Sequence, residues 1–137
     1  MSQYYELGDR TLWNPSNGVS RLFMSQVTVY QAAVGLPSGI GPMEADECQI
    51  DPIAFEAFVV ALLAWHSETR HAVMASLSEG FVATVLALAE MVNIEVSWQE
   101  AKRAESHYLK TASDPHAKEW TGALEWKSRE LLRHMAY

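Results

Sequence analysis

Apolar residues recur every three or four positions over most of the chain, which is the spacing of an α-helix with one buried face. Five segments show this spacing, and each predicts a helix: residues 19–34, 52–70, 76–92, 98–112 and 117–135. The second segment is the most apolar of the five, and its stripe of large side chains ends at His66. We therefore expect the helix that begins at residue 52 to be the central one.

Residues with known capping preferences support these boundaries. Asp51-Pro52 predicts a helix start, because aspartate accepts hydrogen bonds from free amides and proline fits the first helical position. Another start is expected at Ser76, which forms a capping box with Glu79. Two residues are suited to the left-handed conformation that ends many helices: Gly35 and Asn93.

The N-terminal residues follow a different pattern. Within residues 3–13, two short runs of aromatic and branched residues flank Gly8-Asp9, which permits a small hairpin or a pair of edge strands. Such a pair is marginally stable alone and must lie on the helices. The sequence thus predicts a mostly α fold, a single-domain helical bundle of about five helices with a small N-terminal β-hairpin or strand pair.

The charges divide the chain unevenly. It has 137 residues, a length that suits one domain, and a net charge of −7. Residues 1–97 hold three basic and eleven acidic side chains, whereas residues 98–137 hold seven and six. We expect residues 1–97 to form a helical core with the strand pair, and residues 98–137 to add a C-terminal helical hairpin to the same domain. The aromatic side chains of that hairpin would pack on the core or, alternatively, form a homodimer interface.

Charge, length and cysteine content argue against several functional classes. Three cations in the first 97 residues are too few to neutralise a nucleic-acid backbone. The longest uncharged apolar run, residues 57–66, is shorter than the roughly 20 residues of a membrane span, so none is expected. The first residues lack the pattern of a secretory signal and the single cysteine has no internal partner, so we predict a cytoplasmic protein. No nucleotide, metal or nucleophile motif is present, and we predict no cofactor.

The densest cluster of candidate functional side chains lies just before the second predicted helix. Its acidic members, Glu44, Asp46, Glu47 and Asp51, fall within eight residues. Hard cations bind such oxygens, but the spacing is not that of an EF-hand. Acids before a helix are also favoured by its dipole, with Asp51 as the cap. A third alternative is a surface for a basic partner. Cys48 lies within this run, where negative charge disfavours a thiolate, and we predict a small buried residue there.

His66 continues the apolar stripe of its helix, so we expect a hydrogen-bonded histidine in the core or beside a pocket. In an enzyme, His66 would work with Asp46 or Glu47 as acid and base. Glu68 and His71 have the spacing of half a di-iron site. A di-iron site needs two such pairs of glutamate and histidine three residues apart, and the sequence holds only one, so no metal site is predicted.

Four segments carry a resemblance to a known family: TLWNPSNGVSRLF, GLPSGIGPMEADECQID, FEAFVVALLAWH and EGFVATVLALAE. Over about residues 3–97 the chain resembles a family of small uncharacterised actinobacterial proteins known as a domain of unknown function. The resemblance implies no activity and no functional residue. It implies that residues 1–97 are the shared unit and that residues 98–137 are an extension.

The favoured hypothesis is a non-catalytic interaction protein, like an inhibitor or immunity protein. It would present an acidic surface, centred on Glu44, Asp46, Glu47 and Asp51, to a basic protein. The alternative is a small cofactor-independent enzyme that uses His66 with Asp46 or Glu47 as acid and base on a small-molecule ligand. A third possibility is a homodimer through residues 98–137.

Overall fold

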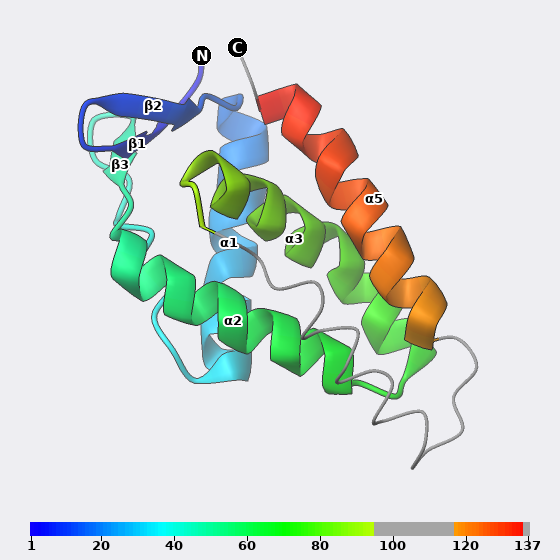
Figure 1. The fold of residues 1–137 in the computed structure, drawn as a ribbon. Coiled ribbons are helices and arrows are strands. Elements are labelled where there is room, and N and C mark those ends of the chain that lie inside the picture. The colour runs from blue at the N-terminus through cyan, green and yellow to red at the C-terminus, as the bar shows by residue number, and fades with distance from the viewer. Residues whose placement is uncertain (95–116, 136–137) are drawn as a thin grey trace.

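The computed structural model describes residues 1–94 and 117–135, and this part of the chain contains four helices and three strands (Figure 1). In chain order the elements are β1 (Tyr4–Leu7), β2 (Arg10–Trp13), α1 (Asn17–Val34), β3 (Glu47–Gln49), α2 (Pro52–Glu68), α3 (Ala72–Met91) and α5 (Ala117–Met135). The strands form one mixed sheet at one end of the helices. The predicted fold class, a bundle of about five helices with a strand pair, was therefore wrong: the fold is mixed α/β. The helix predicted for residues 98–112 lies outside the described residues.

β1 is the central strand of the sheet, whose order is β2-β1-β3. It runs antiparallel to β2 through a turn in which Gly8 has a φ of 60°. This is the hairpin that the sequence permitted, although β1 is not an edge strand. It runs parallel to β3, with Tyr5 beside Cys48. The side chains of these two residues are 0% and 2% exposed, so this pairing joins the sheet to the core. The unpredicted strand is what makes the sheet three-stranded.

β3 is one arm of a hairpin that spans residues 39–51, which we call the acidic hairpin. Its turn is closed by hydrogen bonds between Glu44 and Glu47, 2.9 Å from the Glu44 amide and 3.0 Å from the Glu47 amide. The two central residues, Ala45 and Asp46, have φ values of 51° and 63°. Two positive φ values in succession are the mark of a type I′ turn, whose twist matches that of the flanking strands.

The sequence reading missed this hairpin for two physical reasons. Acidic residues are rare in strands, and the turn lacks the asparagine and glycine that adopt positive φ most easily. One signal was present, because the polar residues Glu47, Gln49 and Asp51 alternate with apolar Cys48 and Ile50. In the structure, both apolar side chains are buried and all three polar residues are exposed.

Most predicted helix ends are confirmed. An Asp51 side-chain oxygen accepts hydrogen bonds from the first free amides of α2, and Gly35 and Asn93 are left-handed with φ values of 74° and 65°. The predicted start at Ser76 was wrong. α3 begins one turn earlier, after His71, whose Nδ1 accepts a hydrogen bond from the helix at 3.4 Å. A histidine cap was overlooked because serine is the commoner capping residue.

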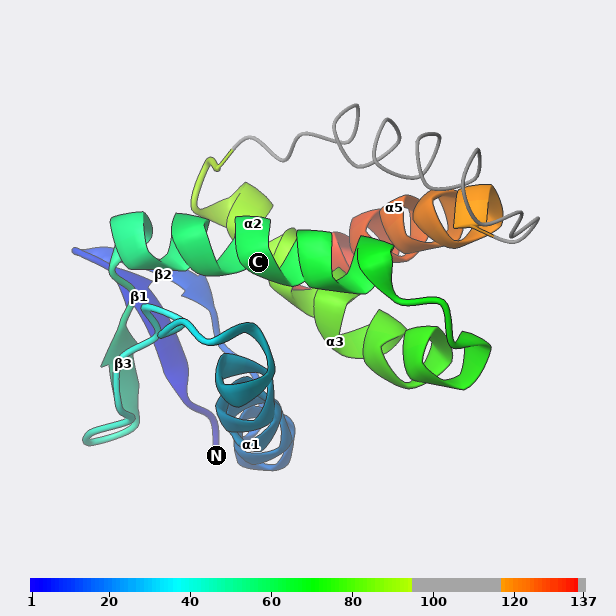
Figure 2. The ribbon, with the colours of Figure 1, turned by 90° about the horizontal axis from the view of Figure 1, so that it is seen from below.

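The central helix is α3, and not α2 as the sequence suggested. Figures 1 and 2 place α3 between α1, α2 and α5. Phe81 of α3 stacks on Tyr30 of α1 with ring centroids 4.3 Å apart, and it also stacks on Phe23 at 5.6 Å. Ten residues of α3 are buried. By length and composition this helix would also pass as a membrane span, and burial among the other helices accounts for the same apolar composition.

Candidate functional site

Three of the four predicted acidic residues gather at the tip of the acidic hairpin. Glu44, Asp46 and Glu47 are exposed, and each lies in or beside the two-residue turn. The turn is also joined to the sheet, because the backbone oxygen of Asp46 accepts a hydrogen bond of 2.8 Å from the Tyr4 amide. The three carboxylates therefore project from a backbone whose position is fixed by the sheet.

The fourth residue, Asp51, has a different task. Its Oδ1 lies 3.1 Å from the amide of Ile53 and 3.4 Å from that of Ala54, so this carboxylate caps α2. Its amide donates to the backbone oxygen of Gly39 at 2.8 Å, at the base of the hairpin. The structure thus separates the capping acid from the three acids at the tip.

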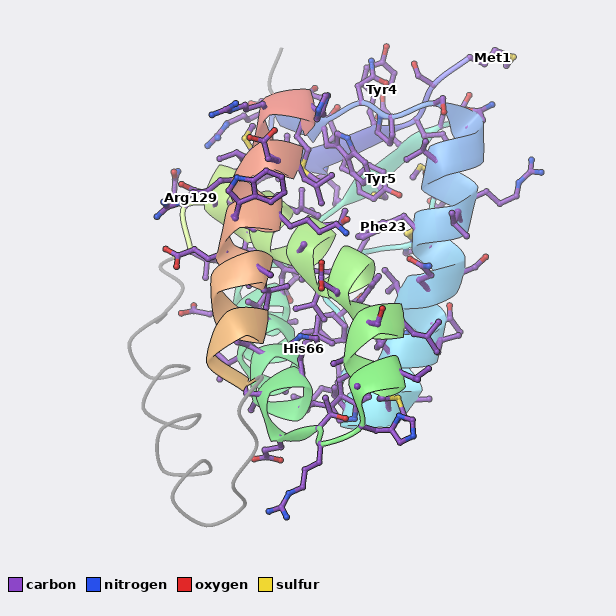
Figure 3. All side chains as sticks on the ribbon, turned by 90° about the vertical axis from the view of Figure 1, so that its right-hand side faces the viewer. Met1, Tyr4, Tyr5, Phe23, His66 and Arg129 are labelled. Carbon is purple, nitrogen blue, oxygen red and sulfur yellow. The ribbon has the colours of Figure 1, made fainter. Side chains whose placement is uncertain are left out.

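The outer face of the sheet extends the charge of the tip. Tyr4 pairs with Glu47 across β1 and β3, while Tyr5 points inward and donates to or accepts from the Ser20 hydroxyl at 2.9 Å. Figure 3 shows Tyr4 directed away from the core and Tyr5 directed toward Phe23. Because alternate side chains of a strand share a face, Glu6 lies on the side of Tyr4. It is half-buried and accepts a hydrogen bond of 2.9 Å from the Thr11 hydroxyl. We call Tyr4, Glu6, Glu44, Asp46 and Glu47 the acidic sheet face.

The sequence reading missed two members of this face, Tyr4 and Glu6. Successive side chains of a strand point to opposite faces, so the sequence of β1 could have placed both residues on the side opposite Tyr5. Their proximity to the hairpin depends on the pairing of β1 with β3, whose partners are more than 40 positions apart. No local pattern encodes a pairing at that separation.

His66 is a core residue. Its side chain is 5% exposed, and its Nδ1 lies 2.9 Å from the hydroxyl of Ser78 on α3. The Ser78 hydroxyl donates its hydrogen to the Met74 carbonyl at 2.9 Å, so the arrangement favours the His66 tautomer that carries its proton on Nδ1. Burial lowers the pKa of His66, and the negative charge of Glu79 acts in the opposite direction.

His66 and the tip carboxylates lie in different parts of the molecule. Figure 3 places His66 among the helices, away from the strand that carries Tyr4 and Tyr5. Asp51 begins α2 beside the sheet, and His66 is fifteen residues farther along the same helix, which corresponds to about 22 Å. Direct proton transfer requires groups within hydrogen-bond reach or one water apart. This geometry lends no support to an acid and base pair formed by His66 with Asp46 or Glu47.

The buried histidine predicts a specific pH dependence of stability. Because the pKa of His66 is lower in the folded state, the unfolded chain binds its proton more readily, near pH 6.5. The contribution of neutral His66 is complete above that pH and is lost as the pH falls from 6.5 toward the folded pKa. We expect the free energy of unfolding of His66→Gln to fall less than that of the unsubstituted protein between pH 7.5 and 5.5. Urea titrations monitored by circular dichroism would measure this, and equal losses would contradict it.

Cys48 is buried in the sheet, as predicted. Burial raises the pKa of its thiol to about 11, and the charge of Glu6 adds to this rise. The thiolate is therefore scarce near neutral pH, which makes Cys48 a poor nucleophile. Burial likewise raises the pKa of Tyr5 to about 12, against the opposing effect of its hydrogen bond to Ser20.

Potential metal ligands do not converge within the described ranges. No group of three histidine, cysteine or acidic side chains gathers there around a common point. His71, the second member of the Glu68 and His71 step, instead caps α3. The described geometry thus provides no oxygen or nitrogen cage at the hairpin tip or at the end of α2.

The family of the chain follows from a comparison with family models. A model of the family of unknown function DUF6086 matches residues 1–137. The chain belongs to this family. No curated protein and no solved structure matches it. The DUF6086 match includes residues 98–137, which the sequence resemblance placed outside the shared unit.

Membership in DUF6086 assigns no chemistry to the site. The functional argument therefore depends on the geometry of the acidic sheet face and of the buried His66. The first is exposed, charged and held by the sheet, whereas the second is enclosed and hydrogen-bonded within the core.

Proposed function

We propose that this DUF6086 protein is a non-catalytic interaction protein whose acidic sheet face binds a basic protein partner, in the manner of an inhibitor or immunity protein. The observation that carries the proposal is the arrangement of three exposed carboxylates, Glu44, Asp46 and Glu47, at the tip of a hairpin fixed to the sheet.

The fixed backbone of the hairpin favours binding. Its arms are joined by a hydrogen bond of 2.8 Å from the Gly41 amide to the Gln49 oxygen, and β3 is paired along its length with β1. Ordering a mobile loop costs free energy on association, and a loop that is already ordered avoids this cost. The tip carboxylates can thus meet a complementary charge with little loss of backbone freedom.

Tyr4 supplies the second feature of a protein interface. Its side chain is 37% exposed and lies on the strand beside Glu47. Tyrosine is enriched at the centre of interfaces, where its ring is buried and charged residues form the rim. Arg10, at the start of β2, is the basic residue closest in sequence to Tyr4. Its side chain donates a 2.6 Å hydrogen bond to the Met91 carbonyl at the end of α3. This face therefore matches a partner with lysine or arginine around an apolar pocket.

The proposal predicts a charge-reversal effect with a matched control. Glu44→Lys/Glu47→Lys should lower affinity for the partner at least tenfold, because two attractions become repulsions. The control Glu56→Lys/Glu68→Lys makes the same change in net charge at exposed positions of α2. Both variants should keep their free energy of unfolding within about 1 kcal/mol, because exposed charges contribute little to stability.

The measurement is affinity capture from a cell extract with the three proteins as bait, followed by calorimetric titration of the purified partner. We expect the control to retain the partner and the charge reversal at the tip to lose it. Raising the salt concentration should weaken the unsubstituted complex, since screening reduces attraction between exposed charges. Equal affinity for both double variants would overturn the proposal.

The remaining parts of the functional hypothesis stay predictions. They are that the protein is cytoplasmic, that nucleic acid is not a partner and that the family is actinobacterial. The homodimer alternative loses one source of contact area, because Leu124 and Met135 of α5 are buried within the same chain. None of the described contacts favours the alternative of a small cofactor-independent enzyme.

A further inference from the structure

A pocket of about 360 Å³ lies between α1 and α5, away from the acidic sheet face. Its apolar lining residues, among those that the structure describes, are Trp13, Pro15, Val19, Leu22, Phe23, Leu131 and Met135. Figure 3 shows the side of the molecule on which α1 and α5 flank α3. A volume of this size is at the lower end of the range for small-molecule sites.

The pocket has a buried floor and an exposed rim. Trp13, Phe23 and Met135 are 8%, 4% and 4% exposed, and the Trp13 and Phe23 rings meet edge to face at 5.3 Å. Val19 and Leu22, on successive turns of α1, remain 50% and 63% exposed. The rim thus presents apolar surface to water that a bound hydrocarbon would cover.

The polar groups of the lining limit the charge of the ligand. Among the described residues that line the pocket none is acidic, although acids outnumber bases by seven in the chain, and His134 is the one ionisable residue of that described set. The other polar lining residues are Ser16, Gln26 and Thr84. The Ser16 hydroxyl oxygen accepts a hydrogen bond of 3.4 Å from the Val19 amide, and the Thr84 hydroxyl donates to the Gly80 carbonyl at 2.7 Å. The first turn of α1 and the last turn of α5 both contribute, so their opposite dipoles offset each other. The side chains of the lining therefore decide which charge the ligand carries, and they suit an anion better than a cation.

We propose that the pocket between α1 and α5 binds a small apolar molecule that carries one carboxylate. The hydrocarbon part lies on Trp13, Phe23 and Leu22, and the carboxylate accepts hydrogen bonds from Gln26 or His134. This site is separate from the acidic sheet face, and its ligand is a small molecule and not a basic protein.

The test is calorimetric titration of the full chain with hexanoate, octanoate and octylammonium. Saturable binding with one ligand per chain is expected for the carboxylates. Affinity should rise about fourfold for each added methylene, the value expected when a methylene leaves water for an apolar site. Octylammonium should bind at least tenfold more weakly than octanoate. Absence of saturable binding would overturn the proposal, and equal binding of the amine would overturn its charge assignment.

Substitutions on α1 locate the site. Leu22→Glu should lower octanoate affinity at least tenfold, because it places a like charge at the rim. The control Val29→Glu introduces the same charge on the same helix at a residue that is also 63% exposed but does not line the pocket. It should leave affinity unchanged. Val19→Glu provides a second rim variant should Leu22→Glu unfold, as judged by circular dichroism.

Two outcomes would replace this ligand with another occupant. Octanoate binding that survives both rim substitutions would place the carboxylate elsewhere on the molecule. Concentration-dependent dimerisation that Leu22→Glu abolishes, measured by sedimentation velocity, would assign the pocket to a second copy of the chain.

Discussion

Replacing Leu124 by aspartate should lower the free energy of unfolding by about 4 kcal/mol or more. Leu124 is 1% exposed on the face of α5 that packs against α3, and removing a buried leucine side chain alone costs about 2–5 kcal/mol. The new carboxylate would also lose its hydration without a basic partner, which adds a further penalty. Since small domains are stable by about 5–15 kcal/mol, this loss removes a large part of the total, and the variant should unfold at a much lower urea concentration.

The control is Trp126→Asp, two positions away on the same helix. Trp126 is 66% exposed, so its replacement should change stability by no more than about 1 kcal/mol. Urea unfolding monitored by circular dichroism would give both values. Similar small losses for the two variants would mean that α5 contributes little to the core.

This comparison also tests the predicted division into a core of residues 1–97 and an extension of residues 98–137. α5 packs on α3, and the Lys127 ammonium lies 3.3 Å from a Glu79 carboxylate oxygen. If α5 belongs to the same cooperative unit, Leu124→Asp destabilises the whole protein in one transition. A separate early transition for α5 would support an extension that detaches on its own.

Replacing Gly39 by alanine should lower the free energy of unfolding by about 3 kcal/mol or more. Gly39 has a φ of 76°, where a Cβ atom is unfavourable by about 1–2 kcal/mol. In addition, that Cβ would lie 2.5 Å from the Phe55 nitrogen and 2.8 Å from the Asp51 oxygen. Both are backbone atoms in the first turn of α2, so relief requires the acidic hairpin and the helix to move apart.

Gly35→Ala separates the cost of a positive φ from the cost of the steric clash. Gly35 has a similar φ of 74°, but a Cβ there would meet no atom within 4 Å. Gly35→Ala should therefore lower the free energy of unfolding only by the backbone term of about 1–2 kcal/mol. The measurement is again urea unfolding, and the difference between the variants reports the clash. Equal losses would show that Gly39 is not closely packed against α2.

The consequence for the site is that Gly39→Ala should also displace the tip carboxylates. The Gly39 oxygen accepts a 2.8 Å hydrogen bond from the Asp51 amide at the base of the hairpin. A weaker interaction with the partner in a folded Gly39→Ala variant would link hairpin position to function. Gly39 is not among the residues that line the α1 and α5 pocket, so the same substitution should leave octanoate binding unchanged.

Sequence alone determined the local structure of most helices. Asp51, Gly35 and Asn93 mark helix ends through hydrogen bonds and backbone conformations that involve neighbours within a few residues. The hairpin of β1 and β2 was also predictable, since its strands are joined by one short turn. The burial of His66 followed from the apolar stripe that it continues, and Cys48 was predicted to be a small buried residue because the acidic run disfavours its thiolate.

Tertiary structure decided the rest, because it depends on partners far apart in the chain. The parallel pairing of β1 with β3 turned an apparent acidic loop into a strand, and it joined Tyr4 and Glu6 to the tip carboxylates. Both α2 and α3 are strongly apolar, so periodicity could not decide which one is enclosed by the others. Packing of α3 against α5, and of its Phe81 against α1, decided it. Local sequence fixes which residues begin and end a helix, whereas the surface that a helix or strand buries is set by the elements that fold against it.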